Sequence, residues 1–378
     1  MSITRRKLVL TGATVALASP FLARAAANPW LIGQSSPQTG VLAASSAETT
    51  SGTRLYFSRL NARGGVHGRP VELVSLDDGQ DAKRAAANTQ ALLDQGVHAL
   101  AMYRTTPTIE ASLPLARKAG IAFIGNQVGP SLLYEAGLSN VFNTRASYHD
   151  EVARAVKFFS QLGVDRVAVL AASDAFGKDV MAGLQQATAQ MKVSLVAQAS
   201  LDNRVADVSA QLEQIRAANP QIVLLIANGK AASEFVKRAR ASDFAPTFVA
   251  LSNNSSATFV KDLERYAEGV VVTQVLPTPY SGRVRVVSEF REALAQGSGA
   301  AVPVLSHATL QGYVNGKFIH EAIRRAGPDA DRARIVQALN GAGRIDLGDF
   351  ALSYSSESRQ GSRLAELTVI GRDGRFMY

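Results

Sequence analysis

The 378-residue chain has no cysteine, one tryptophan and only five histidines. The absence of cysteine excludes disulfide bonds, thiolate metal sites, thiol catalysis and lipid attachment through a lipobox cysteine. His67, His98, His149, His307 and His320 show no His-x-x-x-His spacing within a helix, so scattered core or surface residues explain them better than a metal site. The sequence predicts neither a metal nor a cofactor.

Enzyme motifs are also missing. There is no Gly-x-x-x-x-Gly-Lys-Ser/Thr phosphate loop, no Gly-x-Gly-x-x-Gly after the first expected strand and no Gly-x-Ser-x-Gly elbow. The paired carboxylates Asp77 and Asp78 stand at the end of an expected strand with no histidine or third acid nearby, which counts against a catalytic or metal site. We expect that the protein is not an enzyme.

Neither a strong net charge nor a long apolar run marks most of the chain. Hydrophobic residues make up 47% and charged residues 19%, which is typical of a globular protein with a large core. The formal charge of +9 falls to +5, 36 basic against 31 acidic residues, when the first 27 residues are set aside. This weak excess does not favour nucleic acid as a partner.

Residues 1–27 have the layout of an export signal. Arg5, Arg6 and Lys7 precede a short apolar run, and Ala23 to Ala27, interrupted by Arg24, offer an Ala-x-Ala cleavage site. The Arg-Arg pair predicts a twin-arginine signal, which means export after folding. No other stretch reaches 18 apolar residues, so we expect a soluble mature protein in the periplasm after cleavage.

From Trp30 onward, short aliphatic or β-branched runs alternate with amphipathic helical stretches, as in α/β folds. We expect strands at 30–33, 71–76, 99–103, 122–124, 166–171, 194–199, 222–227, 247–251 and 269–273. Helices are expected at 81–95, 306–326 and 330–339. Two halves, roughly 29–146 and 147–275, repeat this rhythm, and a tail strand at 366–370 could cross back to complete a sheet. The sequence predicts two doubly wound parallel-sheet lobes, with a ligand site beyond the carboxyl ends of their strands.

Several motifs carry a resemblance to a known family. The block from Asn61 to Arg69 (NARGGVHGR) is the most specific, and it is joined by Asp174 to Gly177 (DAFG) and Asp373 to Phe376 (DGRF). From about residue 30 to 378 the chain resembles the leucine/isoleucine/valine-type periplasmic binding proteins, the solute receptors of ABC transporters. The Asn61 to Arg69 block also makes physical sense as a helix end with left-handed glycines. We therefore interpret that block as structural.

The resemblance implies a type I periplasmic binding fold, in which two lobes joined by a hinge close on a small solute. We expect an N-terminal lobe of 29–146 plus 276–353 and a C-terminal lobe of 147–275 plus 354–378. The expected function is to capture a small polar organic solute, amino-acid-like or carboxylate-bearing, and to deliver it to a membrane-embedded ABC permease. The receptor would act as a monomer that docks transiently. The alternative is a periplasmic sensor for an amide or aromatic acid that feeds a signalling partner.

The resemblance also implies ligand contacts in the first lobe. A hydroxyl that holds the solute carboxylate falls at Thr105 or Thr106, before a helix whose N-terminal amides could share the anion. In the next contact loop, Val128 stands where amino-acid receptors usually have threonine. The remaining first-lobe candidates are Gln38, Ser45, Tyr103, Arg104, Asn126 and Gln127. An Arg104 that points into the cleft would favour a carboxylate or an aromatic acid.

The second lobe departs from the amino-acid receptors. Phe176 replaces the tyrosine of many relatives, and the loop that should carry an acid for the solute ammonium contains Ser252 and Asn253 instead. Tyr148 and Asn228 are the other candidates. A buried ammonium without an ionic partner is costly. We therefore expect a carboxylate-bearing solute that is not a typical α-amino acid.

Overall fold

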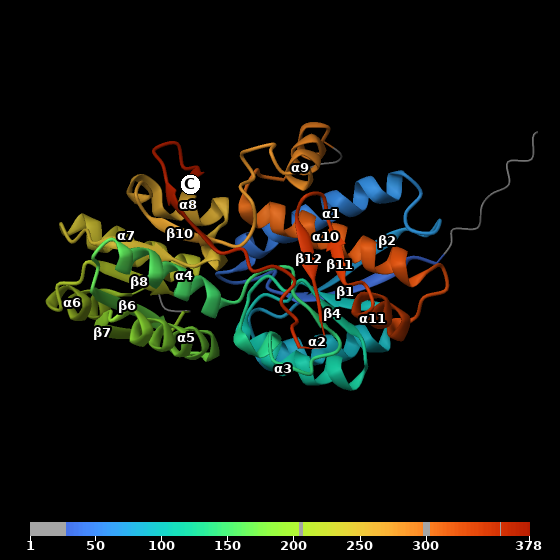
Figure 1. The fold of residues 1–378 in the computed structure, drawn as a ribbon, viewed down its shortest axis with the longest axis horizontal. Helices are drawn as coiled ribbons and strands as arrows, with labels where there is room; N and C mark the ends of the chain where they lie inside the picture. Colours follow the sequence, from blue (N-terminus) through green and yellow to red (C-terminus); the bar gives the residue numbers. More distant parts are fainter. Residues whose placement is uncertain (1–27, 204–206, 298–302, 356) are drawn as a thin grey trace, which may run out of the picture.

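The computed structural model describes residues 28–203, 207–297, 303–355 and 357–378, so the predicted export signal lies outside the described residues. Two α/β lobes lie side by side along the long axis of the molecule (Figure 1). Each contains a central sheet with helices on both faces, which confirms the predicted fold class.

The first sheet is wholly parallel and has the strand order β2-β1-β3-β4-β5. Its strands are β1 (Trp30–Ser36), β2 (Val71–Asp77), β3 (Ala99–Ala101), β4 (Ala122–Ile124) and β5 (Val141–Phe142). The connecting helices are α1 (Ala43–Ala62), α2 (Ala82–Asp94) and α3 (Thr106–Lys118), and the turn η1 (Ser131–Leu133) precedes β5. The order reverses between β1 and β3, which is the switch point where doubly wound sheets bind ligands.

The second sheet has the order β14-β13-β10-β9-β8-β6-β7. Its parallel strands are β6 (Arg166–Ala172), β7 (Ser194–Leu201), β8 (Ile222–Ile226), β9 (Thr247–Ala250) and β10 (Val271–Gln274). Its helices are α4 (Tyr148–Gln161), α5 (Ala175–Met191), α6 (Ser209–Ala217), α7 (Gly229–Ala241) and α8 (Ala257–Leu263), with short turns η2 (Ser252–Asn254) and η3 (Glu264–Tyr266).

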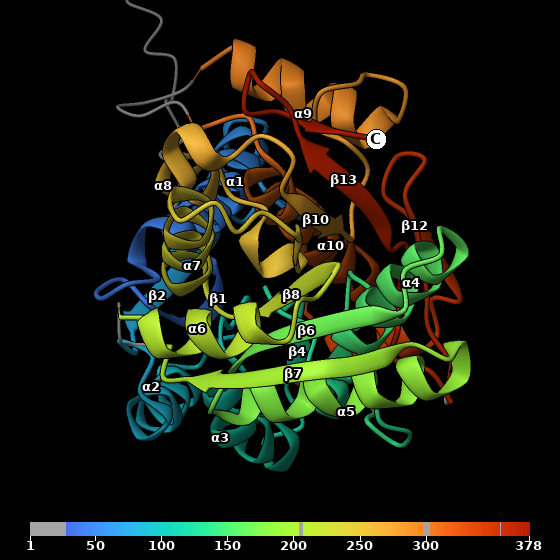
Figure 2. The same ribbon diagram turned by 90° about the vertical axis from the view of Figure 1, so that its left-hand side faces the viewer.

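The tail returns to this second sheet as predicted. Strand β13 (Glu366–Ile370) pairs with β10, with Val271 opposite Val369, and β14 (Phe376–Met377) forms the edge (Figure 2). Strand β13 runs antiparallel to β10, and β14 runs antiparallel to β13, so the second sheet is mixed and not wholly parallel. The sequence pattern could not give this direction, because a strand's direction depends on where the preceding segment leaves it.

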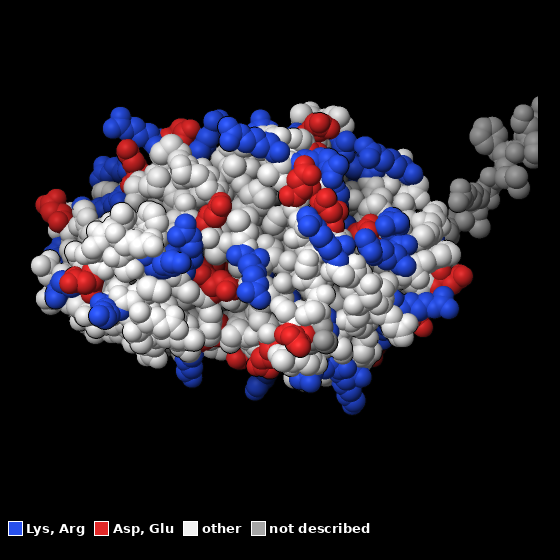
Figure 3. Space-filling model, in the orientation of Figure 1, with Lys and Arg blue, Asp and Glu red and all other residues white. Residues whose placement is uncertain are grey.

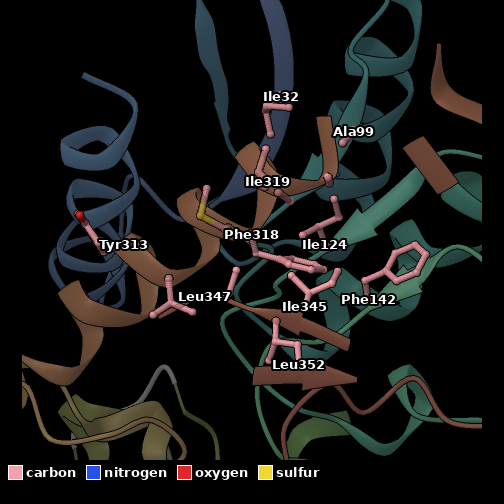
Figure 4. Packing of buried hydrophobic residues seen from close by; sticks show 14 of the residues in the cluster. Ile32, Ala99, Ile124, Phe142, Tyr313, Phe318, Ile319, Ile345, Leu347 and Leu352 are labelled. Atoms are coloured by element: carbon pink, nitrogen blue, oxygen red, sulfur yellow. The ribbon is translucent and has the colours of Figure 1, made fainter. Parts of the chain in front are cut away.

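The segment between β10 and β13 packs on the first sheet. It contains α9 (Arg285–Ala295), α10 (His307–Ala326), α11 (Arg332–Asn340) and the hairpin of β11 (Arg344–Asp346) and β12 (Ala351–Ser353). Figure 4 shows side chains of α10 and of this hairpin meeting side chains of β1, β4 and β5, and all of them belong to one buried cluster. The chain therefore passes between the lobes after β5, after β10 and after β12.

Glycine lets α1 and α10 pack closely. A Cβ on Gly52 would lie 1.9 Å from the Thr309 carbonyl oxygen, and one on Gly312 would lie 1.7 Å from the Thr49 oxygen. Such distances are far inside van der Waals contact, so a larger residue at either position would force the helices apart. The predicted structural role of the Asn61 to Arg69 block is confirmed as well, since Gly65 has a φ of +69° directly after α1.

Within the ranges that the structure describes, no helix is both long and apolar enough to cross a membrane. The same ranges contain no group of three or more His, Asp or Glu side chains arranged to hold a metal ion.

Candidate ligand-binding cavity

A cavity of about 360 Å³ lies between the lobes, and its wall comes from the carboxyl ends of strands in both sheets. Eight of the predicted site residues line it: Arg104, Thr105, Thr106, Val128, Tyr148, Phe176, Asn228 and Asn253. A cavity of this size at this position suits a small organic ligand. The structure thus brings together residues that lie up to 149 positions apart in the chain.

The other six predicted residues lie outside the cavity wall. Gln38 is exposed, and its amide donates to Ser75 in a groove on the outside of the first lobe. Tyr103 is fully buried behind the wall, where its hydroxyl pairs with Thr89 at 2.8 Å. The rule that residues after a strand face the ligand fails for Tyr103, because successive side chains of an extended segment point to opposite sides.

Asn126 and Gln127 are also buried away from the cavity wall. The Asn126 side chain accepts from the backbone N–H of Tyr103, and the Gln127 amide donates to the Met102 carbonyl oxygen at 2.9 Å. Both side chains hold the loop after β3 against the loop after β4. Their positions favour a loop-stabilising role over a ligand contact for these two residues.

Ser45 and Ser252 lie beside the cavity but do not line it. The Ser45 hydroxyl accepts a hydrogen bond from Arg104 at 3.2 Å and donates to the Leu42 carbonyl. Ser252 is bound to a buried ion pair, since its hydroxyl accepts from Arg145 at 2.8 Å and donates to Glu151 at 2.9 Å. Ser45 therefore supports a wall residue from behind, and Ser252 is held by the ion pair.

The ion pair between Arg145 and Glu151 lies beside the loop at Ser252, where amino-acid receptors are expected to carry an acid for the solute ammonium. Glu151 is fully buried and also accepts from the Ser252 amide and from the Thr273 hydroxyl. Burial raises the pKa of Glu151, and the neighbouring Arg145 opposes that change. The carboxylate closest to the loop at Ser252 is thus already paired with an arginine and has no free charge for a ligand ammonium.

Seven wall residues were missed by the sequence analysis: Leu42, Gln80, Pro107, Ser173, Asp174, Asp202 and Asn203. Four of them could have been found. Ser173 and Asp174 follow β6, and Asp202 and Asn203 follow β7, so the carboxyl-end rule covers all four. Leu42 and Gln80 lie in the loops after β1 and β2, six and three residues beyond the strand ends, where the rule does not say which side chain faces the cavity.

Arg104 is the most unusual residue of the wall. Its side chain is 94% buried (6% exposed), and its Nη2 donates to the Ser45 hydroxyl and to the Asn253 carbonyl oxygen at 3.1 Å. Burial lowers the pKa of Arg104 below its usual range. Among the described residues it forms no ion pair, and its hydrogen bonds to them all come from Nη2, not from Nε or Nη1. A buried guanidinium therefore faces the cavity without a carboxylate in ion-pair contact, although Glu48 acts on it from a greater distance and raises its pKa.

Thr106 provides a second unsatisfied donor beside Arg104. Thr105 is the N-cap of α3, and its hydroxyl and that of Thr108 form a capping box. Thr106 comes next, is 2% exposed, and its hydroxyl has no hydrogen-bond partner among the described residues. Pro107 has no backbone N–H, so this position of the first turn has no donor that needs a partner. Arg104 and Thr106 together offer a site for an anionic group.

One part of the wall is apolar and aromatic. The rings of Tyr148 and Phe176 have centroids 5.0 Å apart at an angle of 54°. Val128, Leu42 and Pro107 extend this surface. It suits the hydrocarbon or aromatic part of a ligand.

The polar residues of the second-lobe wall mostly serve the protein itself. Asp174 caps α5 by accepting from the Gly177 amide at 3.2 Å. The Asn228 side chain caps α7 through the Ala231 amide at 3.1 Å and donates to the Asn203 carbonyl oxygen at 2.7 Å. In Asn253, the side-chain oxygen is buried and has no partner among the described residues. The second lobe thus presents acceptors rather than cations.

Comparison with known proteins agrees with this architecture. The sequence matches the family described as periplasmic binding protein over residues 29–375. It is 23% identical over 366 residues to the Leu/Ile/Val-binding protein homolog 7 of Brucella suis, which covers 92% of this chain and 90% of that protein. An amino acid binding protein of Pseudomonas aeruginosa is 26% identical over 196 residues, which is 51% of this chain, and the chain spans about half (52%) of that relative.

Among solved structures, a substrate-binding periplasmic protein from Ralstonia solanacearum is 28% identical and has a TM-score of 0.85. That match covers 92% of this chain and 99% of the other. The family match spans nearly all of the described chain, both lobes and the cavity wall included. The chain therefore belongs to the periplasmic binding protein family, and within that family it is similar to the leucine/isoleucine/valine-binding proteins.

Proposed function

We propose that this protein is a periplasmic receptor that captures a small carboxylate-bearing organic solute in the cavity and delivers it to an ABC permease. One observation carries the choice of solute: Arg104 is buried in the cavity wall and forms no ion pair with any described residue. A buried charge without a partner is strongly unfavourable, whereas a paired one is tolerated. A ligand carboxylate would supply the partner by accepting a charge-assisted hydrogen bond from one of the remaining Arg104 donors, Nε or Nη1.

The rest of the wall narrows the class of acid. The Tyr148 and Phe176 rings favour an apolar or aromatic body next to the carboxylate. The relatives named above are Leu/Ile/Val or amino acid binding proteins, but here the acid near Ser252 is paired with Arg145. We therefore favour an aromatic or aliphatic acid without an α-ammonium group over a branched-chain amino acid.

Several further properties belong to the same proposal. The lobes are 29–146 plus 276–353 and 147–275 plus 354–378, and residues 1–27 are a cleaved twin-arginine signal. The receptor acts as a monomer without a cofactor, catalyses no reaction and docks transiently on the permease. On the face shown in Figure 3, basic and acidic side chains are interspersed, and nucleic acid is not among the proposed partners.

Thermal unfolding of residues 28–378 tests the proposal against aromatic acids, aliphatic mono- and dicarboxylates, branched-chain amino acids and neutral amides. A ligand at a thousand times its Kd stabilises the folded protein by about 4 kcal/mol, which raises the midpoint by several degrees. We expect the largest rise with an acid that lacks an amino group. Leucine as the best ligand would contradict the proposed solute, and a folded, ligand-free protein that responds only to neutral amides would favour a sensor.

A further inference from the structure

Helix α1 of the first lobe contacts the second lobe directly through Glu48. This residue is 9% exposed, and one carboxylate oxygen accepts from the backbone N–H of Ala257 at 2.8 Å. The other oxygen accepts from the N–H and the hydroxyl of Thr258, at 3.3 and 3.2 Å. These donors belong to the first turn of α8, which packs on α7 and the second sheet. The bonds exist only while the two lobes are in contact.

The first lobe holds Glu48 in place for this contact. The hydroxyl of Ser306 donates to the Glu48 oxygen that also receives the Ala257 amide, and Ser306 is the N-cap of α10. Helix α10 in turn packs on α1 at the Gly52 and Gly312 contact. The carboxylate is therefore fixed relative to the first lobe before the second lobe reaches it.

Arg104 holds the same segment of the second lobe. Ser45 lies one turn before Glu48 on α1 and accepts from Arg104, whose Nη2 also donates to the Asn253 carbonyl oxygen. The segment 253–258 thus meets two first-lobe residues. Arg104 reaches it from the cavity wall, and Glu48 reaches it from outside, since Glu48 does not line the cavity.

We propose that Glu48 is a positioning residue that holds the lobes closed by receiving the first-turn amides of α8, and so sets the affinity for any ligand without contacting it. The inference rests on the proposed receptor function, in which the lobes close on the ligand. In that case the apparent Kd equals the intrinsic Kd divided by the fraction of molecules whose lobes are closed. Weakening the contact should raise the Kd of every ligand by the same factor. A change at Arg104 should alter the preference among ligands.

Two variants remove the contact from opposite sides. Glu48→Gln keeps the shape and removes the charge on the first lobe. Ala257→Pro removes one donor on the second lobe and leaves Glu48 and Ser306 untouched. Proline is tolerated at the first helical position, and Ser256 before it already has a ψ of 153°, which a residue preceding proline requires. Glu72→Gln, an exposed glutamate on β2, is the matched control.

The absence of cysteine allows a measurement that needs no ligand. Spin labels at Lys118→Cys on α3 and Gln186→Cys on α5, both exposed, report the distance between the lobes by pulsed electron resonance. Because hydrogen bonds to charged groups are strong, we expect both variants to raise the ratio of separated to closed lobes by about tenfold. Glu72→Gln should leave the distance distribution unchanged.

Either of two results would overturn the inference. The first is that Glu48→Gln leaves the distances between the lobes unchanged. The second is that Glu48→Gln lengthens them while a folded Ala257→Pro variant does not. That second result would mean that Glu48 only supports α10 within the first lobe. The proposed function is tested separately. It fails if no acid of the panel binds, even when both variants separate the lobes as expected.

Discussion

The two walls of the cavity use polar residues in different ways. On the first lobe, the Arg104 guanidinium and the Thr106 hydroxyl are buried, and part of their hydrogen-bonding capacity is unused by the described residues. On the second lobe, Asp174 and Asn228 cap α5 and α7, and the Asn253 side-chain oxygen is left without a partner among the described residues. A polar residue in a cavity wall is therefore not automatically a ligand contact. Those whose donors remain free are the better candidates.

The largest expected effect is at Arg104. Arg104→Gln should weaken binding of the acid ligand about 100-fold, or ~3 kcal/mol, because it removes the charged partner from a buried pair. Titration calorimetry measures this, and neutral amides tested in parallel should not lose affinity. Unchanged affinity for the acid would mean that its carboxylate binds elsewhere. The free donors of the first lobe would then not distinguish it from the second lobe as the ligand-binding wall.

Asp78 is a buried acid of the first lobe that does not line the cavity, so it tests whether burial alone makes a polar residue important for binding. It is fully buried, and burial raises its pKa to about 6, although the Gln80 amide and the Ser35 hydroxyl oppose the rise. The folded protein keeps this proton up to about pH 6, whereas the unfolded chain releases it near pH 4. The free energy of unfolding should therefore fall as pH rises from 4 to 6, by up to ~3 kcal/mol.

Urea denaturation at several pH values tests this for Asp78→Asn, which should lose that slope and keep ligand affinity. The neighbouring Asp77 is the control with the opposite sign. Partial burial would raise its pKa, but hydrogen bonds from Gln38, Thr39 and Gly79 outweigh burial and lower it to about 2. Its stabilisation is present above pH 4 and is lost toward pH 2. An Asp78→Asn variant that changes affinity as much as Arg104→Gln would show that buried charge anywhere in the first lobe controls binding.

On the second lobe, Asn228→Ala should affect folding more than binding. The variant loses the α7 cap and the bond to the Asn203 carbonyl, which lowers the free energy of unfolding by ~1–2 kcal/mol. Affinity should change by less than about threefold, since that side chain is occupied by the protein. A tenfold loss of affinity at normal stability would make Asn228 a ligand contact.

The smallest change in free energy is expected at Thr106. Thr106→Val keeps the side-chain shape and removes an unpaired hydroxyl, so affinity for the acid should fall about five- to tenfold, or ~1 kcal/mol. The midpoint of thermal unfolding without ligand should stay the same or rise, because a buried unsatisfied group is lost. A lower midpoint with unchanged affinity would mean that Thr106 serves the helix, as Asn228 does.

Much of the fold could be predicted because each element carries its own periodicity. Strand β4 was predicted to the residue, and α2 and α10 to within a residue or two at each end. The short strands β5 and β11 were not predicted, since two or three residues hold too little pattern to distinguish them from loops. Their strand character comes from pairing with neighbours that are distant in sequence.

The sequence by itself determined the α/β alternation, the two similar halves, the family motifs and Arg104 as a candidate after β3. Only the tertiary structure decided which candidates share a cavity, because Tyr103 and Arg104 are adjacent in the chain but point to opposite sides. It also decided that the acid beside Ser252 is Glu151, 101 positions earlier in the chain, and that Arg145 neutralises it. Local patterns determine which segments become helices and strands, whereas charge pairing depends on contacts that form only when distant segments pack together.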